Sequence, residues 1–321
     1  MDNIKRIIDI LRDSKDYVSG DYISEILGVS RTAVWKYIKN LEKHGYRINT
    51  LKGKGYMLND TPDAPLPWEI ESFLNTKTIG REIIYKKTID STNSMAFKLA
   101  LSGKSEGTCV IAEAQQAGRG RLNRTWFSPE GKNLYLSIIL RPNIEPSKIY
   151  PITFISCLAV YDTIEVVSGI VPGLKWPNDV LINSKKVCGT LVEISAESDM
   201  VKFVIAGIGL NVNMEEKDLA EDIKHRATSL YMETKRSYNR AYICGVMLNA
   251  FEKYYEVFKK AGGGEICRLW EERAKINGRY IEVNQMGETI RGVSEGIDAT
   301  GALLLNVDGT TKRIIVGDTT F

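Results

Sequence analysis

The sequence predicts an α+β protein of three domains: an N-terminal helix-turn-helix domain with a wing, a central α/β domain with a mixed sheet, and a small C-terminal β-barrel. Three observations support this prediction. Helical periodicity broken by glycine occupies the N-terminal part, a proline-rich polar segment follows at residues 59–67, and short strands with glycine turns begin near Lys275. A chain of 321 residues is also too long for one ordinary hydrophobic core.

Three short helices and a hairpin are expected in the first domain. Apolar residues at helical spacing predict a helix over residues 3–13, and a second helix over residues 22–27 ends at Gly28. Ser30 is a favourable N-cap for a third helix. Two helices joined by a glycine-containing turn form a helix-turn-helix, and the strand–turn–strand pattern of residues 46–58 predicts its wing.

The excess positive charge of the chain lies in this domain. Residues 1–60 hold 11 Lys and Arg against 8 Asp and Glu, whereas the remaining residues hold 32 of each sign. A local basic excess is typical of a module that binds a polyanion such as DNA. The expected DNA contacts are Arg31, Thr32, Trp35, Lys36, Lys39, Lys43, Lys52 and Lys54. The alternative is an ordinary three-helix adaptor whose charges are only solvated.

Strands and helices alternate through the central region, with a mixed sheet expected. The expected strands are Glu82–Lys86, Thr108–Ala112, Leu134–Leu140, Leu174–Lys175, Val180–Ile182, Lys186–Ile194 and Lys202–Leu210. The expected helices are 92–102, 149–168 and 238–260. Four strands are expected in the barrel, at Tyr280–Val283, Glu288–Ile297, Ala302–Asn306 and Lys312–Val316. The expected domain limits are 1–60, a linker at 61–67, 68–272 and 273–321.

Composition argues against several classes of protein. No apolar run approaches the roughly 20 residues of a membrane helix, and the N-terminus lacks the apolar block of a signal peptide. The five cysteines are scattered without a Cys-x-x-Cys motif, so a reducing cytoplasm is expected rather than a disulfide framework. Two histidines are too few for a zinc site, and no protein-held metal is expected.

One loop carries an unusual density of arginine and glycine. Residues 115–126 place Arg119, Arg121 and Arg124 among glycines and end at Trp126. Glycine lets a backbone approach a ligand, arginine offers a planar fork to phosphate or carboxylate, and tryptophan offers a face for a purine. The loop begins like a dinucleotide fingerprint, but Asn123 stands where the third glycine belongs. The alternative is a solvated basic loop.

Two further motifs carry candidate ligand contacts. A hairpin around residues 183–184 would return Lys186 toward Asn178 and Asp179, clustering an ammonium, an amide and a carboxylate. Residues 207–213 close a strand with two glycines and Asn211, which could bond a phosphate or ribose. The alternatives are a turn cap for the first motif and a bulged strand end for the second.

Taken together, these motifs resemble those of the bifunctional biotin–protein ligases that also repress the biotin operon. The resemblance covers the whole chain, and it implies a ligase core and an SH3-like barrel. One departure is Leu122-Asn123, where some relatives have Arg-Gly. The segments that carry the resemblance are Asp90–Asn93, Gly118–Arg121, Lys175–Asp179, Lys186 with Gly189, Gly207–Asn211 and Arg226–Ser229.

The resemblance also implies roles for individual residues. Lys186, Arg119 and Arg121 would be catalytic. The biotin contacts would be Ser91, Thr92, Asn93, Gln115, Gly118, Arg119, Lys186, Gly189, Gly207 and Gly209. The ATP and adenylate contacts would be Arg121, Arg124, Trp126, Asn178, Asp179, Asn211 and Ala227.

The implied reaction forms biotinoyl-AMP from biotin and ATP and passes biotin to a lysine of a biotin carboxyl carrier protein. Mg²⁺ would accompany ATP, held mainly by its phosphates, with Asp179 as the one side chain that could assist. As a repressor, the protein would bind an inverted-repeat operator as a homodimer when it holds the adenylate. No membrane partner is expected.

Three hypotheses remain open at this point. The protein is a ligase and repressor, a ligase whose winged helix binds only proteins, or a regulator whose core senses a nucleotide without catalysis. Lys186 and the arginine loop favour catalysis, because a sensor does not need a lysine between two anions. The basic residues of the first domain favour DNA over a protein partner.

Overall fold

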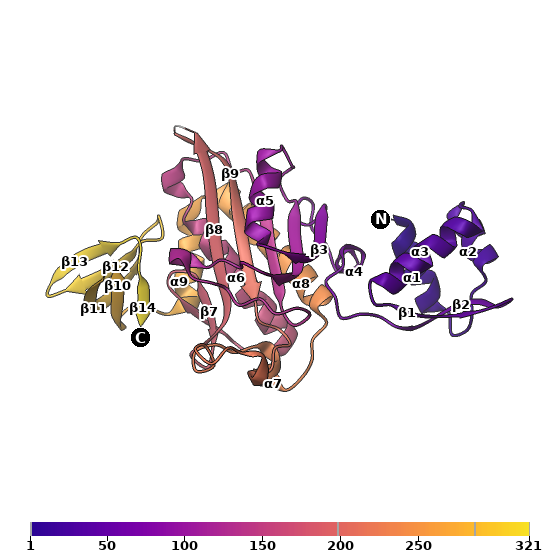
Figure 1. Ribbon diagram of the computed structural model, residues 1–321. Helices are drawn as coiled ribbons and strands as arrows, with labels where there is room; N and C mark the ends of the chain where they lie inside the picture. Colours follow the sequence, from indigo (N-terminus) through magenta and orange to yellow (C-terminus); the bar gives the residue numbers. More distant parts are fainter. Residues whose placement is uncertain (1, 198, 286, 321) are drawn as a thin grey trace.

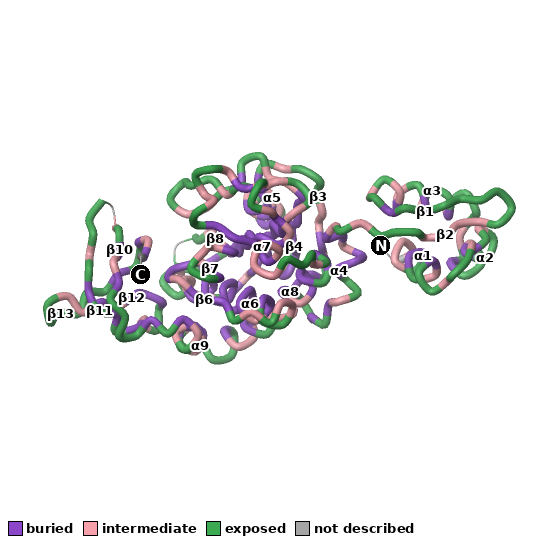
Figure 2. The backbone as a smooth tube through the Cα atoms, turned by 90° about the horizontal axis from the view of Figure 1, so that it is seen from below, coloured by how far each residue is buried: buried purple, intermediate pink, exposed green. Residues whose placement is uncertain are grey.

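The computed structural model describes residues 2–197, 199–285 and 287–320. Three parts follow one another along the molecule: an N-terminal domain of helices and a hairpin, a central α/β domain, and a C-terminal sheet (Figure 1). The N-terminal domain and the C-terminal sheet lie at opposite ends of the central domain. Most buried residues belong to the central domain (Figure 2).

The N-terminal domain is a winged helix, as predicted. Gly28 ends the second helix at a φ of 64°, which favours glycine, and Ser30 caps the third by accepting a hydrogen bond from the backbone of Ala33 at 3.2 Å. The hairpin forms the wing. The elements are α1 (Asp2–Asp13), α2 (Gly20–Leu27), α3 (Arg31–Lys43), β1 (Arg47–Leu51) and β2 (Gly55–Asp60).

A short helix that the sequence analysis missed, α4 (Pro67–Glu71), joins this domain to the centre. Leu66 and Trp68 are buried in the hydrophobic core of the winged helix. Trp68 Nε1 donates to Tyr46 Oη at 2.8 Å, and Tyr46 Oη in turn donates to Glu69. The end of the linker, at Pro65 and Leu66, is therefore buried, whereas Thr61 and Asp63 are exposed.

The central sheet is mixed, as predicted. Its strands are β3 (Ile83–Ile89), β4 (Cys109–Gln115), β5 (Leu134–Leu140), β6 (Gly173–Lys175), β7 (Asp179–Ile182), β8 (Lys185–Glu197) and β9 (Met200–Leu210). They pair in the order β3-β4-β5-β9-β8-β7-β6, with β3 and β4 parallel and the other pairs antiparallel.

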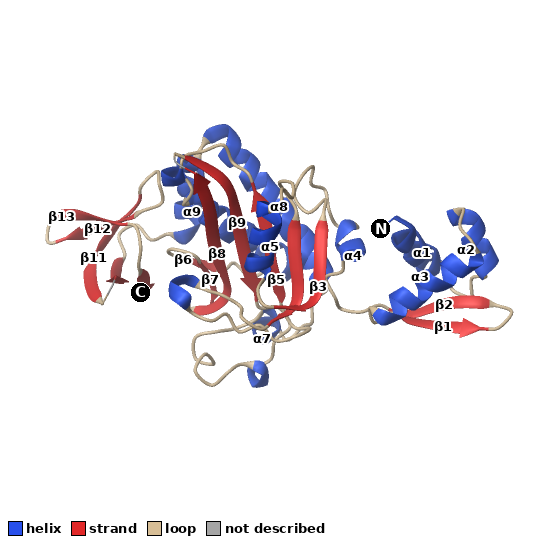
Figure 3. Ribbon diagram, turned by 45° about the horizontal axis from the view of Figure 1, so that its top comes forward, coloured by secondary structure: helices blue, strands red, loops and turns tan. Residues whose placement is uncertain are grey.

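Helices cover both faces of this sheet (Figure 3). One face packs against α5 (Thr92–Leu101) through a small apolar cluster, and the other packs against α6, α8 and α9 through the main core. The remaining helices are α6 (Pro151–Ser168), α7 (Leu230–Thr234), α8 (Arg240–Ala261) and α9 (Gly263–Ala274). The sequence analysis missed α7 and α9.

One segment corrects the expectation that no apolar stretch reaches membrane length. Pro146–Ser168, which contains α6, is long and apolar enough to cross a membrane by length and composition. Of its most apolar window, 72% is buried inside the protein, which is typical of a core helix.

The C-terminal part is an antiparallel sheet with the order β13-β12-β11-β10-β14. Its strands are β10 (Tyr280–Gln285), β11 (Glu288–Ile297), β12 (Leu303–Val307), β13 (Thr310–Ile314) and β14 (Asp318–Thr320). The four strands expected from the sequence are present, whereas β14 was missed. Among the described residues β13 and β14 do not pair, so closure into a barrel stays a prediction.

Candidate functional site

The candidate site lies on the α5 side of the central sheet, beyond the N-terminus of that helix. Side chains alternate between the faces of a strand, so β9 can be assigned residue by residue. Phe203 and Ile205 pack in the cluster under α5. Gly207 and Gly209 follow on the same face, and Gly209 pairs with Gly189 of β8. These three residues form a glycine floor where the α5 side of the sheet carries no side chains.

Close contacts explain why glycine is needed on this floor. A Cβ at Gly207 would lie 2.1 Å from Asn93 Oδ1, and one at Gly209 would lie 2.5 Å from the indole of Trp126. A Cβ at Gly189 would lie 2.9 Å from the same indole. Trp126 therefore packs directly on the floor, and its Nε1 is buried without a hydrogen-bond partner in the described part of the chain.

Polar residues at the start of α5 form one wall of the site. Thr92 donates from its backbone N and its Oγ1 to Gln115 Oε1, at 2.9 and 3.1 Å. Asn93 Nδ2 donates to Glu193 Oε2 at 2.7 Å, and Asn93 Oδ1 accepts from Ser137 Oγ at 2.6 Å. Ser91 caps the helix and is buried. Buried amides held this firmly can recognise a polar ring without reorganising.

Lys186 forms the opposite wall. Asn183 and Ser184 have φ values of 49° and 64°, so the predicted hairpin is present between β7 and β8. It brings Lys186 Nζ to 2.7 Å from Asp179 Oδ1, and 5.3 Å from the centre of the Trp126 ring. Lys186 and Asp179 therefore form an ion pair, and because an ammonium carries three N–H donors, the pair leaves donors for a ligand.

The arginine loop is folded back on itself by two left-handed residues. Leu122 and Asn123 have φ values of 54° and 58°, a region that glycine adopts more easily. The backbone N of Gly120 donates to the carbonyl of Arg124 at 2.7 Å and closes the turn. Leu122 is also 61% exposed, so the loop presents an apolar side chain to solvent.

Each arginine of the loop has an acidic or amide partner. Arg119 pairs with Glu193 at 2.8 Å, and Arg121 donates to Asn178 Oδ1 at 3.2 Å. Both Arg121 and Arg124 also pair with Asp318 of β14. Sequence reasoning missed Asp318, because nothing in its local sequence connects a strand 194 residues away to Arg124.

Amides and backbone segments complete the far side of the site. Asn211 Nδ2 donates to the carbonyl of Thr228 at 2.9 Å, and its Oδ1 accepts from Asn133 Nδ2 at 3.4 Å. Ala227 forms a bridge with Lys186 through backbone hydrogen bonds. Asn133 is fully buried and was not anticipated from the sequence.

The cysteines under the sheet do not supply a nucleophile. Cys157 is fully buried, and burial raises the pKa of its thiol to about 12. Burial also raises the pKa of Cys188 well above its ordinary value. Within residues 2–197, 199–285 and 287–320, no group of three His, Cys, Asp or Glu residues could hold a metal ion.

A second candidate surface lies on the winged helix. Val34, Ile38 and Leu41 face its core, so the other side of α3 faces solvent. The exposed residues include all the predicted DNA contacts, namely Arg31, Thr32, Trp35, Lys36, Lys39, Lys43, Lys52 and Lys54. Arg31 pairs with Asp21 at 2.9 Å and Lys39 with Glu42 at 2.6 Å, so part of this charge is shared.

Comparison with known proteins places the chain in a family. Residues 85–212 match the biotin/lipoate A/B protein ligase family, residues 3–57 an HTH domain, and residues 277–319 the biotin protein ligase C-terminal domain. The bifunctional ligase/repressor BirA of Bacillus subtilis is 39% identical over 315 residues, covering 98% of this chain and 97% of that protein. This chain belongs to the bifunctional ligase/repressor family.

Other similar proteins are more distant. The bifunctional ligase/repressor BirA of Escherichia coli is 30% identical, over 94% of this chain and 92% of that protein. The biotin protein ligase of Aquifex aeolicus, solved in complex with biotin and ATP, has a TM-score of 0.65 and 31% identity. It covers 75% of this chain and 98% of its own.

Replacing Gly207 by alanine should destabilise the protein, because the new Cβ would displace the buried side chain of Asn93. Overpacking of this kind costs about 1–3 kcal/mol, and urea unfolding would measure it. Gly173→Ala is the matched control, because a Cβ there meets nothing nearer than 3.9 Å. Equal unfolding midpoints for the two variants would contradict the described packing of the floor.

Proposed function

We propose that this protein is an ATP-dependent biotin–protein ligase that also represses transcription when it holds biotinoyl-AMP. The observation that carries the proposal is the ammonium of Lys186, paired with Asp179 and set between the glycine floor and the arginine loop. Two anions, a carboxylate and a triphosphate, can meet only where fixed positive charge offsets their repulsion.

The biotin side of the proposed site is the wall at the start of α5. Ser91, Thr92, Asn93 and Gln115 would bond the polar ring of biotin, because the first three are buried and Gln115 is fixed by its hydrogen bond from Thr92. Gly118, Gly189, Gly207 and Gly209 are the proposed backbone contacts, and Trp126 would have to leave Gly189 and Gly209 for the ligand to reach them. Lys186 and Arg119 would meet the carboxylate, provided that Arg119 exchanges Glu193 for the ligand.

The nucleotide side is proposed to run from Trp126 toward Asn211. The contacts would come from Arg121, Arg124, Trp126, Asn178, Asp179, Asn211 and Ala227. Trp126 would stack on the adenine, and Arg121 and Arg124 would leave Asp318 for the phosphates. Each arginine would exchange the Asp318 carboxylate for a phosphate and would keep a negatively charged partner. The loop at residues 115–126 could then close over the ligand without burying an unpaired charge.

The chemistry follows from these positions. The biotin carboxylate attacks the α-phosphorus of ATP, pyrophosphate leaves, and biotinoyl-AMP forms. Lys186 and the arginines stabilise the charge that develops on the phosphate, and the loop excludes water from the anhydride. An uncharged lysine of a biotin carboxyl carrier protein then attacks the carbonyl, and AMP leaves.

Magnesium is proposed to reach the site on the nucleotide. Asp179 is the one side chain proposed as a ligand of the ion, and it is already paired with Lys186. The phosphates of ATP would therefore hold the ion for the most part. When bound it would neutralise phosphate charge. The proposed compartment is the cytoplasm, because all five cysteines are free and buried.

The repressor half of the proposal depends on the winged helix. The N-terminal residues of α3 would read base edges in the major groove, and the lysines of α3 and the wing would meet phosphates. An inverted-repeat operator would bind a homodimer, since two half-sites multiply affinity. A winged helix that binds only proteins remains the competing function.

Replacing Lys186 by alanine should abolish biotin transfer, because the variant loses the charge between the two anions. The rate of adenylate formation should fall by about 10²–10³-fold, as for other preorganised charge donors. Mass spectrometry of a carrier domain incubated with biotin and MgATP should show a gain of one biotin with the wild type only. Lys185→Ala is the matched control and should behave as wild type. If the carrier domain gains the mass of biotin at a near-normal rate with Lys186→Ala, Lys186 does not stabilise the charge in this reaction.

Replacing Arg121 by alanine should shorten the time for which biotinoyl-AMP stays bound. Loss of one charged hydrogen bond should shorten the lifetime of bound biotinoyl-AMP about tenfold or more. A single-turnover trap that measures released adenylate would follow it, with the exposed Arg236→Ala as control. An unchanged lifetime would count against a phosphate contact at this position.

Replacing Lys36 by alanine should weaken binding to a mixed-sequence DNA duplex. It should also reduce the slope of the logarithm of the affinity against the logarithm of the salt concentration by about 1. A salt titration by fluorescence anisotropy measures both quantities. Lys15→Ala, an exposed lysine outside α3 and the wing, should leave them unchanged. If the wild type does not bind DNA, the winged helix serves another partner.

Operator binding should tighten when biotin and MgATP are present together, because ordering the arginine loop lowers the entropic cost of dimerisation. The expected coupling is about 1–3 kcal/mol. Titrating inverted-repeat DNA at one salt concentration, with and without ligands, measures it, and sedimentation follows dimerisation. Equal affinities and equal monomer–dimer distributions would leave the repressor function without support.

A further inference from the structure

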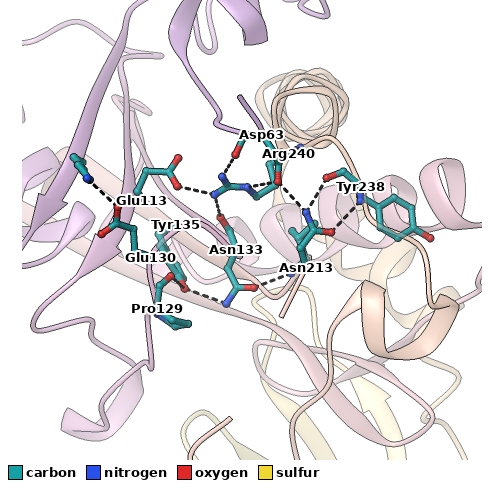
Figure 4. Close-up of polar contacts among 11 residues, drawn as sticks. Asp63, Glu113, Pro129, Glu130, Asn133, Tyr135, Asn213, Tyr238 and Arg240 are labelled. Atoms are coloured by element: carbon teal, nitrogen blue, oxygen red, sulfur yellow. Dashed lines mark hydrogen bonds and ion pairs between the residues drawn. The ribbon is translucent and has the colours of Figure 1, made fainter. Parts of the chain in front are cut away.

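A buried arginine binds the linker (residues 61–67) to the central domain. Arg240, the first residue of α8, is only 1% exposed. Its Nε lies 3.1 Å from Asp63 Oδ2, and its backbone N donates to Asp63 Oδ1 at 3.1 Å. The guanidinium also donates to the backbone carbonyl of Asp63 (Figure 4). Asp63 thereby fixes the linker three residues before Leu66 enters the winged-helix core.

The same guanidinium reaches the strands that carry the proposed ligand contacts. Arg240 Nη1 donates to Glu113 Oε2 at 2.9 Å and to the carbonyl of Asn133 at 3.2 Å. Glu113 stands two residues before Gln115 on β4, and Asn133 bonds Asn211. A buried guanidinium is stable only with its partners in place, so the positions of these groups depend on one another.

Asn213 makes a second connection from the site to the linker. Its Nδ2 donates to Asp63 Oδ2 at 3.0 Å and to the carbonyl of Tyr238 at 2.9 Å (Figure 4). It follows Asn211 by two residues, and Asn133 Oδ1 accepts from the backbone of Val212, which stands between them, at 3.0 Å. The Asn211–Asn213 segment is therefore connected to Asp63 directly through Asn213, and also through Asn133 and Arg240.

We propose that Asp63 is a positioning residue that couples occupancy of the Asn211 side of the ligand site to the attachment of the winged helix. The proposal rests on the proposed function, in which Asn211 contacts the nucleotide. A ligand that orders the Asn211–Asn213 segment fixes Asn213, and Asn213 and Arg240 together then hold the Asp63 carboxylate. The linker, and with it the α4 end of the winged helix, becomes less mobile.

Hydrogen–deuterium exchange on the full chain tests this coupling. With biotin and MgATP, the wild-type linker amides should exchange about fivefold or more slowly than without ligands, the lower end of typical coupling. Asp63→Asn keeps one acceptor oxygen in place of two, so in either orientation of the amide its NH2 group faces a donor of Arg240. In this variant the ligand effect should fall below about twofold. Biotinoyl-AMP formation, measured in the same samples, should stay within about threefold of wild type.

Asp60→Asn is the matched control. Its side chain is 59% exposed, pairs with Arg47 at 3.8 Å and accepts from the backbone N of Thr61 at 2.9 Å. With the Thr61 amide left out of the comparison, the ligand effect on the linker should be that of wild type. Asn213→Ala provides an independent variant in case Asp63→Asn does not fold. It should weaken the ligand effect, because the route through Asn133 and Arg240 remains, and adding it to Asp63→Asn should produce no further loss, because both routes end at Asp63.

Three results would overturn the coupling. In the first, the wild-type linker exchanges at the same rate with and without ligands although biotinoyl-AMP forms. In the second, Asp63→Asn keeps the ligand effect of the wild type. In the third, Asp63→Asn accelerates exchange of the linker amides equally with and without ligands, which indicates a purely structural role for Asp63. If the wild type forms no biotinoyl-AMP, the proposed function fails instead, and the adenylate measurement identifies that case.

Discussion

Strand β9 is hydrogen-bonded on both sides, to β5 and to β8, and its side chains alternate between two tasks. One face carries Val204, Ala206 and Ile208 into the main core. The other begins with apolar residues under α5 and ends with two glycines at the site. A shift of one residue in register would exchange these faces, burying the glycines and exposing the core residues to the site. The core and the ligand site therefore depend on the same pairing.

Charge is arranged in the site as a set of exchangeable pairs. Lys186 is paired with Asp179, and the three arginines of the loop are paired with Glu193 and Asp318, so most of the positive charge is already paired within the protein. An anionic ligand gains by replacing these acids, but it must separate each existing pair to do so. The net attraction is the difference in free energy between the pairs with the ligand and the pairs within the protein. The acids therefore influence the affinity for the ligand as much as the bases do.

Local patterns were enough to predict most elements and the site residues that belong to compact motifs. Ser30, Gly28 and the residue 183–184 turn have signals within a few positions of the structure that they form. α9 was missed because three glycines at its start resemble a loop. Asp318, Asn133 and the Asp63–Arg240 pair could not be predicted, because each depends on contacts between residues far apart in the chain. The roles that the family resemblance implies for individual residues are predictions that the substitutions described above test.

The winged helix keeps part of its hydrophobic core outside its own hairpin and helices, in Leu66 and Trp68. As a module that could be gained, lost or transplanted between proteins, it is therefore incomplete at Asp60. A fusion joined at that point would remove Leu66 and Trp68 from the core and would leave Tyr46 without the indole that donates to its hydroxyl. The transferable unit extends through α4 to Glu71, because Glu69 of this helix pairs with Arg12 of α1. Any protein that accepts the unit therefore also receives Ile70, which packs in the core of the central domain.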